Sequence, residues 1–288
     1  MTELVGVADQ VDLGDQGTVD LQDHDRFDGV SDQAVRPDKS ASAVRSRRWR
    51  WDTSQMTARI LALGGGGFSM EPDNPLLDDF LLSLLPPGRL PKICFLPTAS
   101  GESEEYVADF LAAFGPERAD ASVLSLFRRE IGDLRGFIRT QDAVYVGGGS
   151  TANLLAIWRL HGLDVALREA YDAGVVMAGI SAGMNCWFEA SVTDSFGTDL
   201  DGLADGLGFL AGSSCPHYDG EELRRPAYRQ AVEGGFPGGY AADDGAALFF
   251  EDGVLAEVVA SRPAAQAYRL SLVAGNVVED VLPTRYLG

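Results

Sequence analysis

The chain has 288 residues, 45% of them hydrophobic, and its 43 acidic against 23 basic side chains give a formal net charge of −20. This length and hydrophobic content are enough to bury the core of one large domain. The negative charge argues against nucleic acid or an anionic membrane as a partner, and no apolar run reaches the ~18 residues that cross a bilayer.

The cysteines and the N-terminal residues indicate in which cellular compartment the protein is expected. Cys94, Cys186 and Cys215 are an odd number in apolar or site-proximal surroundings, which favours reduced thiols over a disulfide framework. No basic segment followed by an apolar one opens the chain, so we expect no ordinary export signal. Together these features predict a cytoplasmic protein.

The first 55 residues differ in composition from the rest. They are polar, rich in Asp and without periodic apolar patterning, and they end in a cluster of four Arg between positions 45 and 50. Such a segment cannot bury enough apolar surface to offset its ordering entropy. We therefore predict a disordered acidic tail over residues 1–55 and a single α/β domain over residues 56–288.

After the tail, short apolar runs typical of buried strands alternate with segments of helical periodicity. The expected strands cover residues 59–63, 92–96, 122–127, 143–146 and 175–178. This alternation predicts an α/β fold, with a mostly parallel doubly wound sheet and helices on both faces.

The C-terminal part has a different pattern. Its apolar runs, at 246–250, 254–260 and 267–273, are separated only by short turn segments. Without helices between them, parallel pairing is not expected. They predict a C-terminal antiparallel β meander.

Three glycine-rich turns follow predicted strands, and the carboxyl ends of parallel strands form the ligand-binding edge of a sheet. Gly64–Gly67 is expected to be a tight turn near the site. The glycines at 147–149 precede a helical pattern, so their free N–H groups could bind a phosphate or an oxyanion. The turn lacks the Lys of a phosphate-binding loop and the spacing of a dinucleotide fingerprint. We therefore interpret Gly148 and Gly149 as oxyanion donors.

The third turn has the pattern of a nucleophile elbow. Gly179-Ile180-Ser181-Ala182-Gly183 follows an apolar strand and precedes a segment that can be helical. Such a turn exposes the Ser hydroxyl, and the N–H of the next residue, Ala182, is free to contact an oxyanion. The structural alternative is a glycine-rich turn around a buried serine.

A serine nucleophile needs a general base, and one of the three histidines in the sequence remains as the candidate when the other two are explained. His24 lies in the acidic tail and His161 has the position of a helix cap, which leaves His217 in a loop stiffened by the preceding proline. An acid should orient the imidazole. We favour Asp194, at the end of a short β-like run, with Glu189 as the alternative. The remaining acids between Ser181 and His217, in a Gly/Asp-rich loop, predict solvated turns: Asp199, Asp201 and Asp205.

Taken together, these motifs resemble the dipeptidase E, or α-aspartyl dipeptidase, family of serine peptidases, with cyanophycinases as more distant relatives. The resemblance rests on the first-strand glycines, Phe95–Ser100, Gly147–Leu155, Gly179–Gly183 and Pro216–Tyr218, and covers about the last four-fifths of the chain. It implies a class I glutamine amidotransferase-like fold and a serine triad with Ser181 as nucleophile and His217 as base. The family usually has Asn at the position of Ser150, and its triad acid does not align cleanly here.

The resemblance also implies a substrate. Family members cleave after an N-terminal aspartyl residue, whose carboxylate needs a cation. Arg224 and Arg225, shortly after His217, are the candidates; the alternative is a surface pair with Glu221 and Glu222.

The sequence therefore predicts a serine hydrolase that acts on small peptides through an acyl-enzyme, with no cofactor and no metal. An α/β-hydrolase-like esterase is one alternative, although such enzymes place the acid and the His farther from the elbow. A non-catalytic ligand-binding homologue is another. A homodimer remains open.

Overall fold

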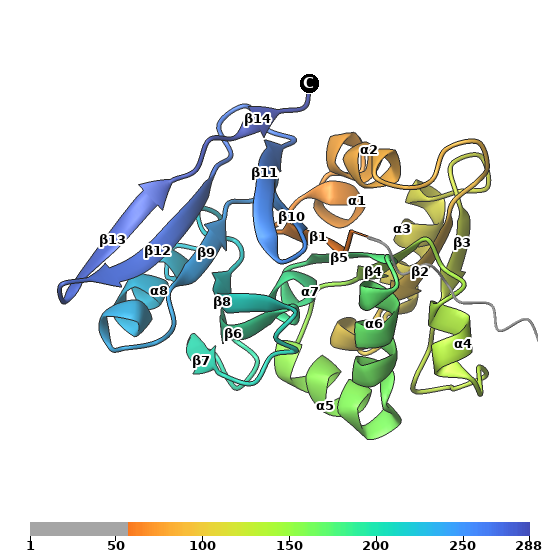
Figure 1. The fold of residues 1–288 in the computed structure, drawn as a ribbon, viewed down its shortest axis with the longest axis horizontal. Coiled ribbons are helices and arrows are strands. Elements are labelled where there is room, and N and C mark those ends of the chain that lie inside the picture. The colour runs from red at the N-terminus through yellow and green to blue at the C-terminus, as the bar shows by residue number, and fades with distance from the viewer. Residues whose placement is uncertain (1–56) are drawn as a thin grey trace, which may run out of the picture. The chain divides into compact units, whose positions relative to one another are not determined.

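The computed structural model describes residues 57–288. The tail predicted over residues 1–55 lies outside the described residues. Within residues 57–288 the chain forms two sheets, flanked by helices (Figure 1). None of the helices in this range combines the length and the apolar character that crossing a bilayer requires.

The first sheet has eight strands, in the spatial order β14-β11-β10-β1-β5-β4-β2-β3. They are β1 (Arg59–Leu63), β2 (Lys92–Leu96), β3 (Asp120–Val123), β4 (Ala143–Val146), β5 (Val176–Ile180), β10 (Ala246–Glu251), β11 (Val254–Ala260) and β14 (Arg285–Tyr286). From β1 to β3 all neighbours are parallel, whereas β10 is antiparallel to both β1 and β11. The predicted α/β sheet with a parallel core is confirmed.

Helices cover both faces of this sheet. They are α1 (Gly67–Met70), α2 (Leu76–Ser83), α3 (Glu104–Ala113), α4 (Leu134–Ile138), α5 (Thr151–His161), α6 (Leu163–Asp172) and α7 (Ala182–Asn185), with a 3-10 turn at Thr98–Ser100. Successive strand residues point to opposite faces. In β1, Leu61 and Leu63 pack with α1, α2 and α3, whereas Ile60 and Ala62 pack with α4 to α7.

The second sheet has six strands, in the order β13-β12-β9-β8-β6-β7. They are β6 (Phe188–Thr193), β7 (Asp201–Leu203), β8 (Leu210–Cys215), β9 (Gly239–Ala242), β12 (Ala267–Val273) and β13 (Asn276–Val281), with α8 (Arg224–Glu233) between β8 and β9. The three C-terminal runs therefore do not form one meander: β10 and β11 extend the first sheet, but β12 pairs with β9 and β13.

Candidate active site

Ser181 lies where the central strand β5 meets α7, in a backbone conformation that few residues adopt. Its φ is 58° and its ψ is −113°, and its N–H donates to the carbonyl of Leu63 at 3.1 Å. The flanking glycines are required: a Cβ on Gly179 would lie 2.3 Å from the carbonyl oxygen of Gly183, and one on Gly183 equally close to that of Val146. Strain of this kind, of order 1–3 kcal/mol, is characteristic of functional turns.

His217 follows the end of β8 and is held by its backbone. Its N–H donates to the carbonyl of Gly64 at 3.1 Å, and its φ is 53°. The Nδ1 atom lies 2.6 Å from Oδ1 of Asp244, and both side chains are nearly buried, at 13% and 14% exposed. An ionised carboxylate only accepts hydrogen bonds, so Nδ1 carries the proton and Nε2 is left as an acceptor. This is the tautomer that a general base needs.

Asp244 is fixed between β9 and β10 beside the first glycine turn. Its N–H donates to Oδ1 of Asp219 at 2.8 Å, and it forms a bridge with Gly65. A Cβ on Gly65 would lie 2.0 Å from Oδ1 of Asp244, so a larger residue there would displace the carboxylate. A cation lies nearby: the pKa of Arg262 is raised by its hydrogen bond to Glu71 and, more weakly, by the charges of Asp244 and Asp219.

The two acids predicted to orient His217 are elsewhere. Glu189 lies on β6 and its Oε2 accepts from the N–H of Gly212 at 2.8 Å, whereas Asp194 lies 3.7 Å from Arg224. Neither is bonded to His217, and Asp244 takes that position instead.

Asp244 was missed because the acid was expected between Ser181 and His217. A signal was present, since Asp244 lies two residues before the predicted strand 246–250. A strand antiparallel to β1 starts at the edge where β1 ends, so an acid just before it reaches the site.

Arg224 and Arg225 are not placed to bind substrate. Arg224 is 3% exposed and bonds to Glu221 at 2.7 Å and to the carbonyl of Val192 at 3.3 Å. Arg225 forms an ion pair with Glu279 and lies over the rings of Tyr218 and Tyr268, at 5.4 and 5.1 Å. Neither lines the cavity that contains Ser181.

The predicted oxyanion donors lie beside the serine. Ala182 is the first residue of α7, and the first N–H of a helix has no acceptor within it. A Cβ on Gly148 would lie 3.3 Å from Cβ of Ser181, and its N–H donates to the hydroxyl of Tyr106 at 3.1 Å. Gly149, with φ 131°, packs against the carbonyl of Ala99. Ala182 and Gly148 thus both lie beside Ser181.

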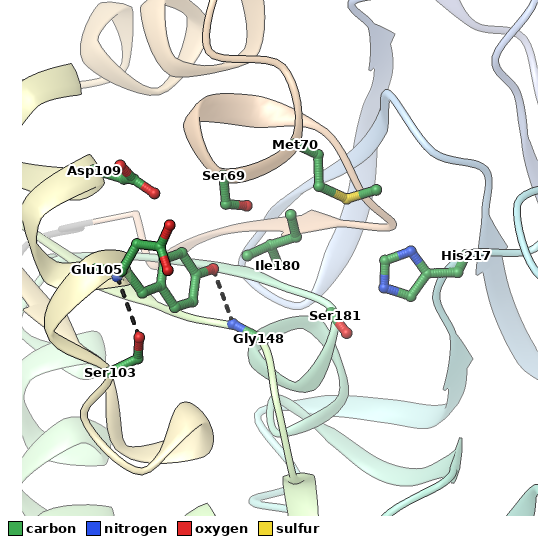
Figure 2. Close-up of a pocket in the computed structure, with 10 residues that line it drawn as sticks. Ser69, Met70, Ser103, Glu105, Asp109, Gly148, Ile180, Ser181 and His217 are labelled. Atoms are coloured by element: carbon green, nitrogen blue, oxygen red, sulfur yellow. Dashed lines mark hydrogen bonds between the residues drawn. The ribbon is translucent and has the colours of Figure 1, made fainter.

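A cavity of about 370 Å³ joins these groups (Figure 2). It is lined by Ser181, His217, Gly148 and Ile180 on one side and by Ser69, Met70, Ser103, Glu105, Tyr106 and Asp109, from α1 and around the start of α3, on the other. Burial is the main cause that raises the pKa of Tyr106, so its hydroxyl stays protonated. The cavity therefore brings together a serine hydroxyl, an imidazole and the backbone of Gly148, which are groups that acyl transfer can use.

Comparison with known proteins agrees with this geometry. The chain matches the model of peptidase family S51 over residues 60–258. It is 53% identical to the uncharacterized peptidase YgaJ of Bacillus subtilis (strain 168) over 231 residues, which are 80% of this chain and 99% of that protein. It is 34% identical to peptidase E of Streptomyces coelicolor (strain ATCC BAA-471 / A3(2) / M145) over 107 residues, 37% of this chain and 42% of that protein.

Two solved structures share the fold at low sequence identity. A putative peptidase E protein from Listeria monocytogenes EGD-e has a TM-score of 0.51 and 18% identity, over 79% of this chain and 100% of that one. A peptidase from an acI-B1 Actinobacterium has a TM-score of 0.54 and 16% identity, over 79% and 95%. These similarities show the fold alone. The family assignment rests on the sequence matches. The chain belongs to peptidase family S51, the dipeptidase E-like serine peptidases, as its motifs predicted.

Proposed function

We propose that this peptidase hydrolyses small peptides with Ser181 as nucleophile, His217 as general base and Asp244 as the acid that orients the imidazole. The observation that carries the proposal is the strained turn at Ser181, in one cavity with a His217 already paired to a nearly buried carboxylate. The cavity volume is near the lower end of the usual range for ligand sites, which fits a short peptide.

The reaction follows from these positions. Nε2 of His217 takes the proton of the Ser181 hydroxyl as its oxygen attacks the scissile carbonyl, and the N–H groups of Ala182 and Gly148 stabilise the resulting oxyanion. His217 then gives the proton to the leaving amine, and water attacks the acyl-enzyme by the reverse transfer. Asp244 stabilises the imidazolium formed in each step.

Two contacts must change for this to occur. Ser181 and His217 are not hydrogen-bonded to each other in the structure, and the N–H of Gly148 is engaged by Tyr106. Catalytic hydrogen bonds often tighten only when substrate binds. The carbonyl oxygen of the substrate would replace the Tyr106 hydroxyl on Gly148.

The predicted fold family, location and substrate specificity differ in the observations that support them. The class I glutamine amidotransferase-like fold fits an elbow that follows the central strand of the parallel sheet. A cytoplasmic location fits the three buried free cysteines. An aspartyl specificity has no support from the cavity, because its lining includes two carboxylates and neither Lys nor Arg.

The test combines a fluorophosphonate probe with a panel of dipeptides. The wild type should be labelled at Ser181 and should hydrolyse at least some peptides, whereas Ser181→Ala should lose both, with a decrease of ~10⁴–10⁶ in turnover. Ser83→Ala, on the exposed face of α2 and outside the cavity, is the matched control and should behave as the wild type.

Other outcomes would contradict the proposal. Normal turnover by pure Ser181→Ala would exclude the mechanism. Hydrolysis of p-nitrophenyl esters without any peptide turnover would favour an esterase. Absence of labelling and of hydrolysis would favour a non-catalytic binding homologue.

A further inference from the structure

The two ends of the active-site cavity differ in chemistry. Ser181 and His217 lie at one end and Glu105 and Asp109 at the other, with Ile180 between them (Figure 2). A peptide held at Ser181 must place the side chain next to its scissile bond somewhere in this cavity. The end opposite the nucleophile therefore decides which side chains are accepted.

Glu105 and Asp109 are four residues apart on α3, so they share one face of the helix. Neither side chain forms a hydrogen bond or an ion pair with any residue in the range 57–288. Both residues line the cavity, and burial, followed by the charges of Asp78 and Asp109, raises the pKa of Tyr106. Two like charges at this spacing repel each other, and a bound cation would relieve that repulsion.

The wall between the two ends is largely apolar. It is formed by the ring of Tyr106 and the side chains of Met70 and Ile180. Long cationic side chains bury their methylene stems against such surfaces and keep the charged head in a polar setting. An aromatic face adds attraction for a cation.

The Tyr106 side chain gives a measure of the distance between the two ends of the cavity. Its hydroxyl bonds to Gly148 beside Ser181, whereas its Cα is in α3 next to Glu105. The length of one tyrosine side chain therefore separates the α3 backbone at Tyr106 from Gly148. The four-carbon stem of a lysine spans a comparable length, but the α-ammonium of a substrate, bound close to the scissile carbonyl, does not.

The helix that carries the acids is held in place. The ring of Phe110 stacks on Phe95 of β2 with centroids 4.5 Å apart, and Ser103 caps the helix by accepting from the N–H of Tyr106 at 3.4 Å. The helix backbone that carries the two carboxylates is thus fixed relative to β2 before substrate binds, as a specificity pocket requires.

Extending the proposed function, on which this inference rests, we propose that Glu105 and Asp109 form a specificity pocket for a cationic side chain, so that the enzyme prefers peptides with Lys or Arg on the acyl side of the scissile bond. This preference is opposite in sign to the aspartyl specificity implied by the family resemblance. It follows from the cavity lining rather than from the catalytic residues.

The experiment compares kcat/KM for Lys-Leu, norleucine-Leu and Asp-Leu. Norleucine has the lysine stem without the charge, so the Lys-to-norleucine ratio isolates the electrostatic contribution. Because both acids are exposed, we expect about tenfold, the lower end of what charge-assisted hydrogen bonds contribute, and less at high salt. The double variant Glu105→Gln/Asp109→Asn should lower the ratio to about one.

The matched control is Glu104→Gln, which removes one charge from the same turn of α3 at a position outside this cavity. It should keep the wild-type ratio. If Glu104→Gln lowers the ratio as far as the double variant does, the effect is one of general charge and the pocket is excluded.

Failure of this inference is distinguishable from failure of the proposed function. Equal turnover of Lys-Leu and norleucine-Leu, or a preference for Asp-Leu, would overturn the specificity pocket while labelling of Ser181 and peptide hydrolysis uphold the peptidase. Loss of both labelling and hydrolysis in the wild type would overturn both.

Discussion

The most discriminating perturbation is Asp244→Asn, because the structure and the sequence-based prediction name different acids. The variant keeps the size of the side chain and the space provided by Gly65. It removes the negative charge 2.6 Å from Nδ1 of His217. An amide can also donate to Nδ1, which would move the imidazole proton to Nε2 and leave no acceptor for the Ser181 hydroxyl.

Two contributions add to the expected loss. The charge-assisted hydrogen bond to a nearly buried imidazolium contributes about 1.5–3 kcal/mol, which is roughly ten- to a hundredfold in rate. The wrong tautomer adds to this, and the corresponding change in a serine protease triad lowers kcat about 10⁴-fold. We therefore expect kcat to decrease between ~10² and ~10⁴-fold, with a much smaller change in KM.

The assay is steady-state hydrolysis of the best dipeptide, with the rate of fluorophosphonate labelling as a second readout. Asp194→Asn and Glu189→Gln are the controls, and each should stay within about threefold of the wild type, because neither side chain is bonded to His217. Near-normal kcat in Asp244→Asn, together with a hundredfold loss in either control, would refute the assignment of Asp244.

The remaining predictions concern the surroundings of the proposed triad. Burial raises the pKa of Asp78 from 3.8 to about 7; the folded state therefore binds more protons than the unfolded state between these values, and the free energy of unfolding should fall by roughly 2–3 kcal/mol from pH 5 to pH 8 through this group. Asp78→Asn should remove that decrease in denaturant titrations, and an unchanged pH dependence would contradict the burial argument. Gly65→Ala should lower kcat by at least about tenfold in steady-state assays, because its Cβ would lie 2.0 Å from Oδ1 of Asp244; wild-type activity would show that the carboxylate can move without consequence. Ser103→Ala should destabilise the protein by about 1 kcal/mol in a thermal melt through loss of the α3 cap, and an unchanged Tm would mean that the cap is dispensable.

The parallel core could be predicted because its inner strands, β1, β2, β4 and β5, are buried on both faces. Such strands appear as continuous apolar runs, and the predicted 59–63, 92–96 and 143–146 coincide with β1, β2 and β4. The predicted run 122–127 extends past β3, which ends at Val123. Beyond Val123, Glu102 accepts hydrogen bonds from the N–H groups of Leu126 and Phe127. These backbone groups therefore bond to a side chain in a loop instead of pairing with a neighbouring strand.

The second sheet could not be predicted in the same way. Its strand β8 has the sequence LAGSSC, with neither apolar alternation nor an apolar run. It becomes a strand by pairing with β6 and β9, which are distant in the chain. The predicted strand 267–273 exists as β12, but its partners are β9 and β13 rather than β11.

The family could be recognised from the sequence alone, and the motifs predicted the elbow at Ser181 and His217 as the base, because a nucleophile elbow is local backbone geometry and the other histidines had ordinary explanations. Which carboxylate pairs with His217 and which residues line the cavity became visible only in the folded chain. Asp244 reaches His217 because β10 pairs antiparallel to β1 and brings its first turn to the edge where β1 ends. Glu105 and Asp109 face the nucleophile because aromatic packing fixes α3 beside β2. Both arrangements join residues that are far apart in the chain, and the spacing of residues along the sequence does not indicate such contacts.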